Sequence, residues 1–350
     1  MNNITHNKTE NARSPGRYHT VYHSVLLFLA LLIILHNFLV PFLYYKMKTL
    51  RKSTNFLLVS LGCADFLTGF LFIPLLVTSA AFSRHGHNYL SLHFTANVVS
   101  DFITLVTVFS LLLVTSERYI ALCHPYIHPK LVTAWSTRCA VVICWSFAVA
   151  IAITPLTWSY PILVGRKADV SDYYKHYSFT ILIGCFFLPS AIMIFCLVSM
   201  FNVIVRFVKQ DTTRGLNVKA GRRSQRKAVF VFLAMFINWF VCWSPLMTIR
   251  LVMDVKKTFS PSKELLEILV ALRCCSSLFN PAIYVWCKTD FKLAFFNIFF
   301  KCFNRKRNNA FELQVVETEA AAKFSLLDQL QSSPSSPMPG KTTSSRSLRV

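Results

Sequence analysis

Five charged side chains interrupt or end long apolar stretches of this sequence. Asp65, Asp101 and Arg273 lie within such stretches, and the adjacent acid and base Glu117 and Arg118 end another, in "LLLVTSERY". A charged residue at the centre of a membrane-spanning helix costs about 2.5–3.5 kcal/mol on insertion scales, so each is a candidate functional site. The chemistry open to them is ion pairing, binding of a charged ligand and coordination of a cation. The sequence offers no nucleophile with a neighbouring base and no metal cluster, so we expect no enzyme.

The apolar stretches that must position these charges are long enough to cross a membrane. The chain of 350 residues is 54% hydrophobic and 15% charged, whereas soluble domains average about 25% charged residues. A spanning helix needs about 20 mostly apolar residues. Seven runs meet this need. They predict an all-α membrane protein, a seven-transmembrane helix bundle, with spans near 24–45, 56–82, 92–116, 139–160, 177–205, 228–253 and 264–287.

The basic residues predict the orientation of this bundle. Segments 46–52, 118–138, 206–227 and 288–307 carry 21 lysines and arginines, and the alternate set, 1–23, 83–90, 160–176 and 254–263, carries 10. Because basic segments stay cytoplasmic, we expect a multi-pass plasma-membrane protein with its N-terminus outside. The glycosylation acceptors Asn3 and Asn7 then lie on the outer side. The net charge of +22 gathers in the cytoplasmic segments, which favours membrane lipids and acidic proteins over nucleic acid as partners.

The sequence also predicts how the chain is divided. An extracellular tail (1–23) precedes the seven-transmembrane domain (24–287), a membrane-surface helix (288–303) and a disordered cytoplasmic tail (304–350). The helix is predicted from "DFKLAFFNIFFKCF", in which phenylalanines alternate with polar and basic residues in an amphipathic pattern. Cys302 at its end is either a palmitoylation site or an ordinary free thiol. The tail is rich in Ser, Thr and Pro, and its end at Val350 fits addition to a PDZ domain.

Short motifs follow one another across the seven runs in a recognisable order. They are Asn37 in the first, "NFLLVSLGCAD" ending at Asp65 in the second, "SERY" in the third, Trp145 in the fourth, Pro189 in the fifth, "CWSP" at 242–245 in the sixth and "NPAIY" at 280–284 in the seventh. This ordered set resembles the rhodopsin-like (class A) G-protein-coupled receptors over residues 24–303, with a looser similarity to adenosine and biogenic-amine receptors. The resemblance implies a receptor that binds a small extracellular ligand and activates heterotrimeric G proteins, with arrestin as a further partner.

The resemblance also implies which residues switch between signalling states. Arg118 is released from Glu117 to contact the G protein, Trp243 forms the floor of the ligand pocket, and the sixth span swings outward about a hinge at Pro245. The predicted activation switch comprises Glu117, Arg118, Tyr119, Trp243, Pro245, Asn280, Pro281 and Tyr284. From the residues alone, Glu117 and Arg118 could instead be interfacial charges that reach for water, and Trp243 an ordinary core aromatic. Residues 221–229 contain no acid that would hold Arg118, which predicts some basal signalling.

Oxygen-bearing side chains of the second, third and seventh spans predict a cation site. Asp65, Thr107, Ser276, Ser277 and Asn280 supply the carboxylate, hydroxyl and amide oxygens that a hard cation requires. The resemblance implies an allosteric sodium ion that stabilises the inactive state. The alternative is a polar cluster held by its own hydrogen bonds. No other cofactor is expected.

The ligand pocket is expected among polar residues in the outer halves of the spans, namely Ser100, Asp101, Trp243, Arg250, Glu267 and Arg273. Asp101 lies 17 residues before Arg118, and Arg273 lies seven before Asn280, so the two charges are at similar depth. Three arrangements are open, in this order of preference: an Asp101–Arg273 ion pair, an acidic ligand bound by Arg273 and Arg250, or an amine bound by Asp101.

Two departures from the family pattern keep a second function open. His93 stands where the family's outer disulfide has a cysteine, and Leu197 stands where the fifth span usually has a tyrosine. The alternative is therefore a receptor-like seven-span scaffold or modulator without G-protein signalling. A light-sensing opsin is not expected, because "ALRCCSSLFN" in the seventh run lacks the lysine that holds retinal.

Overall fold

A computed structural model describes residues 15–84, 90–163, 169–214, 219–256, 258–287 and 289–300. Within these ranges the regular structure consists of helices and no strand, so the all-α prediction is confirmed. Asn3, Asn7, Cys302 and the tail 304–350 lie outside the described residues, and the predictions made for them stay predictions.

Most of the helices follow the seven predicted runs, and two runs are divided by a short π-helical turn. The elements are α1 (Pro15–Lys46), η1 (Lys48–Leu50), α2 (Ser53–Leu67), η2 (Thr68–Phe72), α3 (Ile73–Arg84), α4 (Leu90–Cys123), α5 (His128–Leu131), α6 (Ala134–Ala152), α7 (Leu156–Leu163), α8 (Ser171–Thr180), η3 (Ile181–Phe187), α9 (Leu188–Arg214), α10 (Lys219–Val255), α11 (Lys263–Cys287) and α12 (Thr289–Phe300). The π turns are η2, which joins α2 to α3, and η3, which joins α8 to α9.

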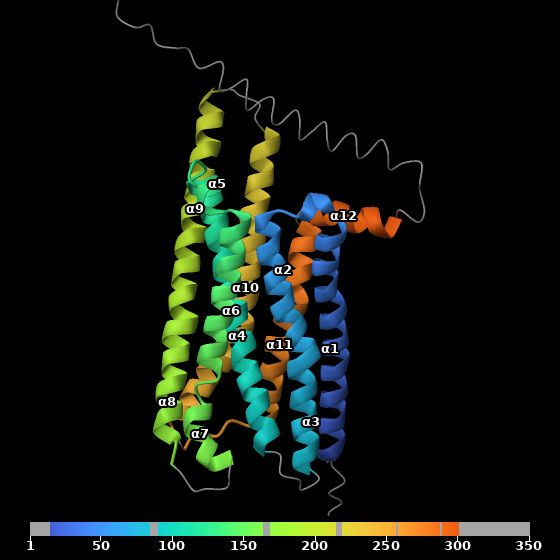
Figure 1. Ribbon diagram of the computed structural model, residues 1–350, viewed down its shortest axis with the longest axis vertical. Helices are drawn as coiled ribbons and strands as arrows, with labels where there is room; N and C mark the ends of the chain where they lie inside the picture. Colours follow the sequence, from blue (N-terminus) through green and yellow to red (C-terminus); the bar gives the residue numbers. More distant parts are fainter. Residues whose placement is uncertain are drawn as a thin grey trace, which may run out of the picture. The chain divides into compact units, whose positions relative to one another are not determined.

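Seven helical segments are long and apolar enough to span a membrane, and they lie alongside one another as a bundle (Figure 1). The chain is a multi-pass membrane protein, as predicted. Its lipid-facing surface is recognisable on α1, where Phe28, Leu31, Leu35 and Phe38 are each more than half exposed. Such a surface would promote aggregation in water, whereas in a bilayer it faces hydrocarbon.

The third span is longer than the sequence predicts. The expected end was residue 116, but α4 continues through Glu117 and Arg118 to Cys123. The charges end the apolar run but not the helix, which persists until the approach to Pro125 restricts the backbone of the preceding residue. Glu117 and Arg118 are therefore held on a rigid helix rather than in a loop.

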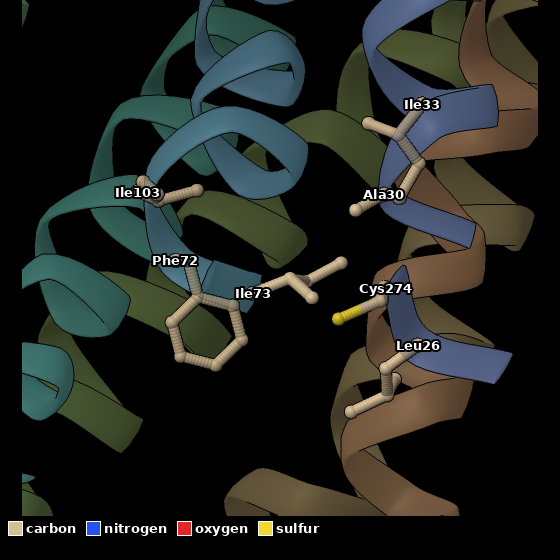
Figure 2. Close-up of a cluster of buried hydrophobic side chains, with 7 residues drawn as sticks. All are labelled: Leu26, Ala30, Ile33, Phe72, Ile73, Ile103 and Cys274. Carbon is tan, nitrogen blue, oxygen red and sulfur yellow. The ribbon is translucent and has the colours of Figure 1, made fainter. Parts of the chain in front are cut away.

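One apolar cluster fixes α1 against three other spans. Leu26, Ala30 and Ile33 of α1 are buried, and their spacing of four and three residues places them on one helix face. They pack against Phe72, Ile73, Ile103 and Cys274. Figure 2 shows Ile73 and Cys274 pointing toward one another across this cluster, with Phe72 beside Ile103. The cluster therefore joins α1, the η2–α3 junction, α4 and α11.

Gly69, within η2, allows a close approach of α1 to the second span. A Cβ atom added there would lie 2.7 Å from the carbonyl oxygen of Ala30 and 3.2 Å from the Cβ of Ile33. The first contact is with backbone and cannot be relieved by a change of side-chain rotamer. A residue without a side chain is therefore required where these helices meet.

The short helix predicted after the last span is present as α12. Phe291 and Ala294 on it are buried, and Asp290 at its start lies 3.6 Å from Lys52. The chain forms two units, residues 1–295 and 296–350. Within the second unit, the structure describes only residues 296–300, which are the end of α12.

Candidate functional site

A cavity of about 250 Å³ opens between α4, α8 and α10, at the end of the bundle where α10 finishes. We call this the cavity end, and the opposite end, where Arg118 lies, the Arg118 end. The cavity has aromatic walls and three charged side chains, two acids and one base. Its lining residues are Phe94, Asn97, Val98, Asp101, Pro155, Tyr174, Tyr177, Ser178, Arg250, Met253 and Asp254. Two of the predicted ligand-site residues, Asp101 and Arg250, are among them.

Asp101 forms an ion pair with Arg250 and not with Arg273. Arg250 Nη1 lies 2.8 Å from Asp101 Oδ1, and the hydroxyl of Tyr177 lies 3.5 Å from Oδ2. The preferred prediction, an Asp101–Arg273 pair, is therefore wrong in its partner. Counting along the helices gives the depth of a residue but not its direction, and one residue is a rotation of about 100°. Asp101 faces α8 and α10, while its neighbour Ser100 faces α11.

Arg273 is buried against Ser100 and two aromatic rings. Only 2% of Arg273 is exposed, and its Nη1 donates a hydrogen bond of 2.5 Å to Ser100 Oγ. Its guanidinium carbon lies 4.2 Å from the ring centre of Phe72 and 4.9 Å from that of Trp243. Nη2 of Arg273 is buried without a hydrogen-bond partner. The predicted residues Ser100, Arg273 and Trp243 are thus brought together, beside the cavity and not in its lining.

Glu267 lies between α1 and α11 and is not one of the cavity-lining residues. Its Oε1 is 3.0 Å from Nδ1 of His19, and the hydroxyl of Tyr22 donates a 3.0 Å hydrogen bond to its carbonyl oxygen. These contacts tie the start of α1 to α11.

An aromatic cluster holds α7 against α8 beside the cavity. The ring of Trp158 stacks on Tyr173 with centroids 5.8 Å apart and meets Tyr174 and Tyr177 edge-on at 6.0 and 5.8 Å. Ser159 and the hydroxyl of Tyr174 are 2.5 Å apart. Tyr174 and Tyr177 also line the cavity, so the cluster positions part of its wall. Sequence analysis did not single out these residues, although the run "SDYYKHY" is an aromatic concentration that could have suggested them.

Replacing Trp158 by alanine is expected to lower the apparent melting temperature of the purified protein. Aromatic pairs contribute about 0.5–1.5 kcal/mol each beyond area burial, and we expect a loss of about 1–2 kcal/mol because Trp158 is only partly buried. Trp135→Ala is the matched control, since Trp135 is 75% exposed. Equal shifts in the two variants, measured by thermal unfolding in detergent, would contradict a role for the cluster.

A chain of polar side chains leads from Trp243 into the middle of the bundle. Trp243 Nε1 donates to Ser276 Oγ at 2.9 Å. Asn238, one turn earlier on α10, donates to the Ser276 carbonyl at 3.1 Å and to Asn280 Oδ1 at 3.2 Å. Asn280 Nδ2 in turn donates to Asp65 Oδ2 at 2.9 Å. The chain links α10, α11 and α2, and Asn238 is the member that sequence analysis missed.

Of the predicted cation ligands, Asn280 contacts Asp65 directly. Asp65 Oδ1 and Thr107 Oγ1 are buried with no hydrogen-bond partner, and Ser277 Oγ lies 3.4 Å from Thr68 Oγ1. Unpartnered buried oxygens of a carboxylate and a hydroxyl fit a hard cation. In the described part of the chain, no group of three His, Cys, Asp or Glu side chains is placed to hold a metal ion, so a cation beside Asp65 would depend on hydroxyl and amide oxygens as well.

At the Arg118 end, Glu117 is the centre of an ion-pair network. Glu117 is 4% exposed. Arg118 Nε lies 2.6 Å from its Oε2, while Thr54 Oγ1 and His128 Nε2 each lie 2.8 Å from its Oε1. Arg118 also hydrogen-bonds Thr54. The predicted Glu117–Arg118 contact is present, and Thr54 and His128 are additional partners from α2 and α5 that adjacent sequence positions could not reveal.

The remaining predicted switch residues whose side chains are described take no part in the Glu117 network. Tyr119 turns to His124, 3.3 Å from its hydroxyl, and so lies outside the contacts of Glu117. Trp239 and Trp243 are both fully buried, as their spacing of four predicts. Pro245 and Pro281 lie inside α10 and α11, which continue through them. The side chain of Tyr284 is outside the described part of the structure.

Comparison with known proteins places this chain in a family. Residues 36–284 match the family model described as "7 transmembrane receptor (rhodopsin family)". The chain belongs to the rhodopsin family of seven-transmembrane receptors. The resemblance seen in the sequence motifs is thus confirmed, and a receptor family agrees with the expectation that the chain is not an enzyme.

Several members of the family are similar to this receptor over most of its length. It is 28% identical to adenosine receptor A2b of Gallus gallus over 313 residues, which cover 81% of this chain and 89% of that protein. It is 25% identical to trace amine-associated receptor 5 of Pan troglodytes over 303 residues, 81% and 88% of the two chains. Pineal opsin of Petromyzon marinus is 25% identical over 276 residues, 75% of this chain and 60% of the opsin.

Proposed function

We propose that this receptor lies in the plasma membrane with its N-terminus outside, binds a small extracellular ligand in the Asp101–Arg250 cavity and activates heterotrimeric G proteins. The relatives' names, which include adenosine and trace amine-associated receptors, support a small ligand. The cavity of about 250 Å³ with aromatic walls and a few charged groups supports the same class.

The observation that carries the proposal is the position of Arg118. The guanidinium of Arg118 is paired with Glu117. The ring of Phe232 on α10 lies 5.8 Å from the guanidinium carbon of Arg118. An outward movement of α10 about Pro245 would remove that ring and leave Arg118 free to turn from Glu117 toward a G protein. Trp243, Asn238 and Phe232 are all on α10, so one helix connects the surroundings of the cavity, the polar chain and Arg118.

The polar residues around Asp65 would form a sodium site in this receptor. Asp65, Thr107 and Asn280, with Ser276 and Ser277, would hold a sodium ion, which would supply the positive charge that a buried carboxylate otherwise lacks. Because these residues come from α2, α4 and α11, they resist separation of the helices when they share one cation. The state in which α10 is close to Arg118 would then be favoured. Arrestin and a PDZ domain stay predictions, since the tail lies outside the described residues.

The test is G-protein activation in cells that express the intact chain, with Arg118→Ala as control. A panel of amines, nucleosides and small carboxylic acids covers the chemistry that the cavity offers. We expect basal or ligand-evoked nucleotide exchange in the wild type and its loss in Arg118→Ala. The alternative, a seven-span scaffold without signalling, is favoured by one observation: Leu197, in place of a tyrosine, is buried and offers no hydroxyl. Silence at confirmed surface expression, with the whole panel, would support the scaffold.

His128→Ala is expected to raise basal signalling. The change removes one of the hydrogen bonds that hold Glu117, each worth about 1 kcal/mol, which is roughly a fivefold shift between two states. Basal nucleotide exchange at matched surface expression is the measurement.

His124→Ala provides the control, because His124 contacts Tyr119 and takes no part in the Glu117 network. A rise of the same size in both variants, or in neither, would show that His128 does not restrain Arg118.

A further inference from the structure

Arg273 is a buried cation, and within the described part of the chain no carboxylate forms an ion pair with it. It is 2% exposed, and the acid at its depth, Asp101, is paired with Arg250. Its Nη1 donates to Ser100 and the Cys274 thiol is a close neighbour, whereas Nη2 is buried without a hydrogen-bond partner. A guanidinium withdrawn from water needs a counter-charge and acceptors for its donors, and the side chains in contact with it supply only part of this.

The two aromatic rings beside Arg273 hold the guanidinium in place without neutralising it. Phe72 at 4.2 Å and Trp243 at 4.9 Å stabilise the cation through their ring faces. Ring faces accept no directed hydrogen bond in the guanidinium plane, so Nη2 remains available at its edge. Phe72 is itself fixed within the apolar cluster of Figure 2, which leaves the arginine little freedom to reach another partner.

The position of Ser100 connects this group to the cavity. Ser100 hydrogen-bonds Arg273, and the next residue, Asp101, lines the cavity. Because Arg250 neutralises Asp101, the cavity-lining acid next to Ser100 in the chain presents little net repulsion to an incoming anion.

We propose that Arg273 and Ser100 form a binding site for a small monoanion beside the cavity. The anion accepts hydrogen bonds from Nη2 of Arg273 and from the Ser100 hydroxyl, and it is either the carboxylate of a ligand or a free halide such as chloride. An anion paired with the guanidinium weakens the attraction between Arg273 and the ring of Trp243, so that occupancy is transmitted to α10. This last step rests on the proposed function, whereas the anion site itself does not.

The proposal is tested on the full chain purified in detergent, by thermal unfolding followed through tryptophan fluorescence. The wild type is compared in sodium chloride, sodium acetate and sodium gluconate at equal sodium concentration and ionic strength, so that any cation site is filled equally. Gluconate serves as the bulkier, strongly hydrated comparison anion. We expect the melting temperature to be about 3–6 °C higher in chloride or acetate, the shift for a ligand at about ten times its Kd.

The same series is then measured for Arg273→Gln, Arg273→Lys and Arg138→Gln. Arg273→Gln should lose the anion dependence, and Arg273→Lys should keep it with weaker affinity because the charge remains. Arg138→Gln, the same substitution at an exposed arginine of α6, should behave as the wild type. Stabilisation by both anions supports a site open to free halide, and stabilisation by acetate alone supports a site for the carboxylate of a ligand.

The proposal is overturned if the wild type melts at the same temperature in all three salts, or if Arg273→Gln retains the full anion dependence. Neither result would affect the proposed function, because the assay contains no G protein. Conversely, absence of G-protein activation would leave the anion site standing.

Discussion

Gly69→Ala is expected to destabilise the receptor by about 2–3 kcal/mol, the upper part of the range for overpacking in a closely packed interior. The new Cβ would lie 2.7 Å from the Ala30 carbonyl oxygen and 3.1 Å from a side-chain carbon of Ile34. Backbone cannot step aside as a flexible side chain can, so α1 would have to move away from η2. That movement would also disturb the cluster around Leu26, Ala30 and Ile33, whose members depend on the same approach.

Gly184→Ala is a closely matched control for this change. Gly184 lies in the other π-helical turn, η3, and a Cβ there would meet no atom within 4 Å. Both substitutions bring the same gain in helix propensity, so their difference isolates the steric conflict. The measurement is the apparent melting temperature of the purified proteins together with surface expression in cells. If Gly69→Ala were as stable as Gly184→Ala, the close packing of α1 on the second span would be wrong.

Arg250→Gln is expected to cost about 3 kcal/mol, near the lower end for breaking a buried ion pair. The side chain of Asp101 is 9% exposed and that of Arg250 35%. Removing the arginine therefore leaves a carboxylate in an enclosed place, with only the Tyr177 hydroxyl at 3.5 Å. Asp101→Asn should cost less, about 1 kcal/mol, because the arginine left behind remains partly in water and the amide keeps the shape of the acid.

The double variant Asp101→Asn with Arg250→Gln decides between a specific pair and two separate defects. We expect it to be more stable than Arg250→Gln alone, because no unpaired charge is then buried. Melting temperatures of the four proteins form the cycle. Additive losses would show that the two side chains act independently. If Asp101→Asn instead rescued Arg273→Gln, Asp101 would be paired with Arg273, contrary to the structure.

The fold was largely predictable because its signals are local. Each span is a run of apolar residues that is visible in the sequence. In a bilayer, an isolated run of that length can satisfy its backbone hydrogen bonds only as a helix. Asp65, Asn280 and the Glu117–Arg118 contact could be placed as well, since motifs on successive spans give their depth.

The directions of side chains and their partners on other spans could not be predicted in the same way. The sequence favours Arg273 as the partner of Asp101 and Arg250 as a ligand-binding residue. One residue is a rotation of about 100° on a helix, so the direction of Asp101 on α4 decides which of the two arginines it meets. Thr54, His128 and Asn238 reach their partners from other helices, and nothing in the sequence around them marks them. Trp158 and its tyrosines matter only once α7 and α8 are side by side.

The two π-helical turns bear on how residues of this receptor are matched with those of its relatives. A π turn closes its hydrogen bond one residue later than an α turn, so it acts as a one-residue insertion that the helix absorbs without a loop. Residues beyond it are rotated by about 100° from where an uninterrupted α-helix would carry them. The cavity residues Tyr174, Tyr177 and Ser178 come before η3 in the chain, and Pro189 comes after it. An ungapped alignment anchored on Pro189 therefore matches these three residues correctly only with relatives that have the same π turn.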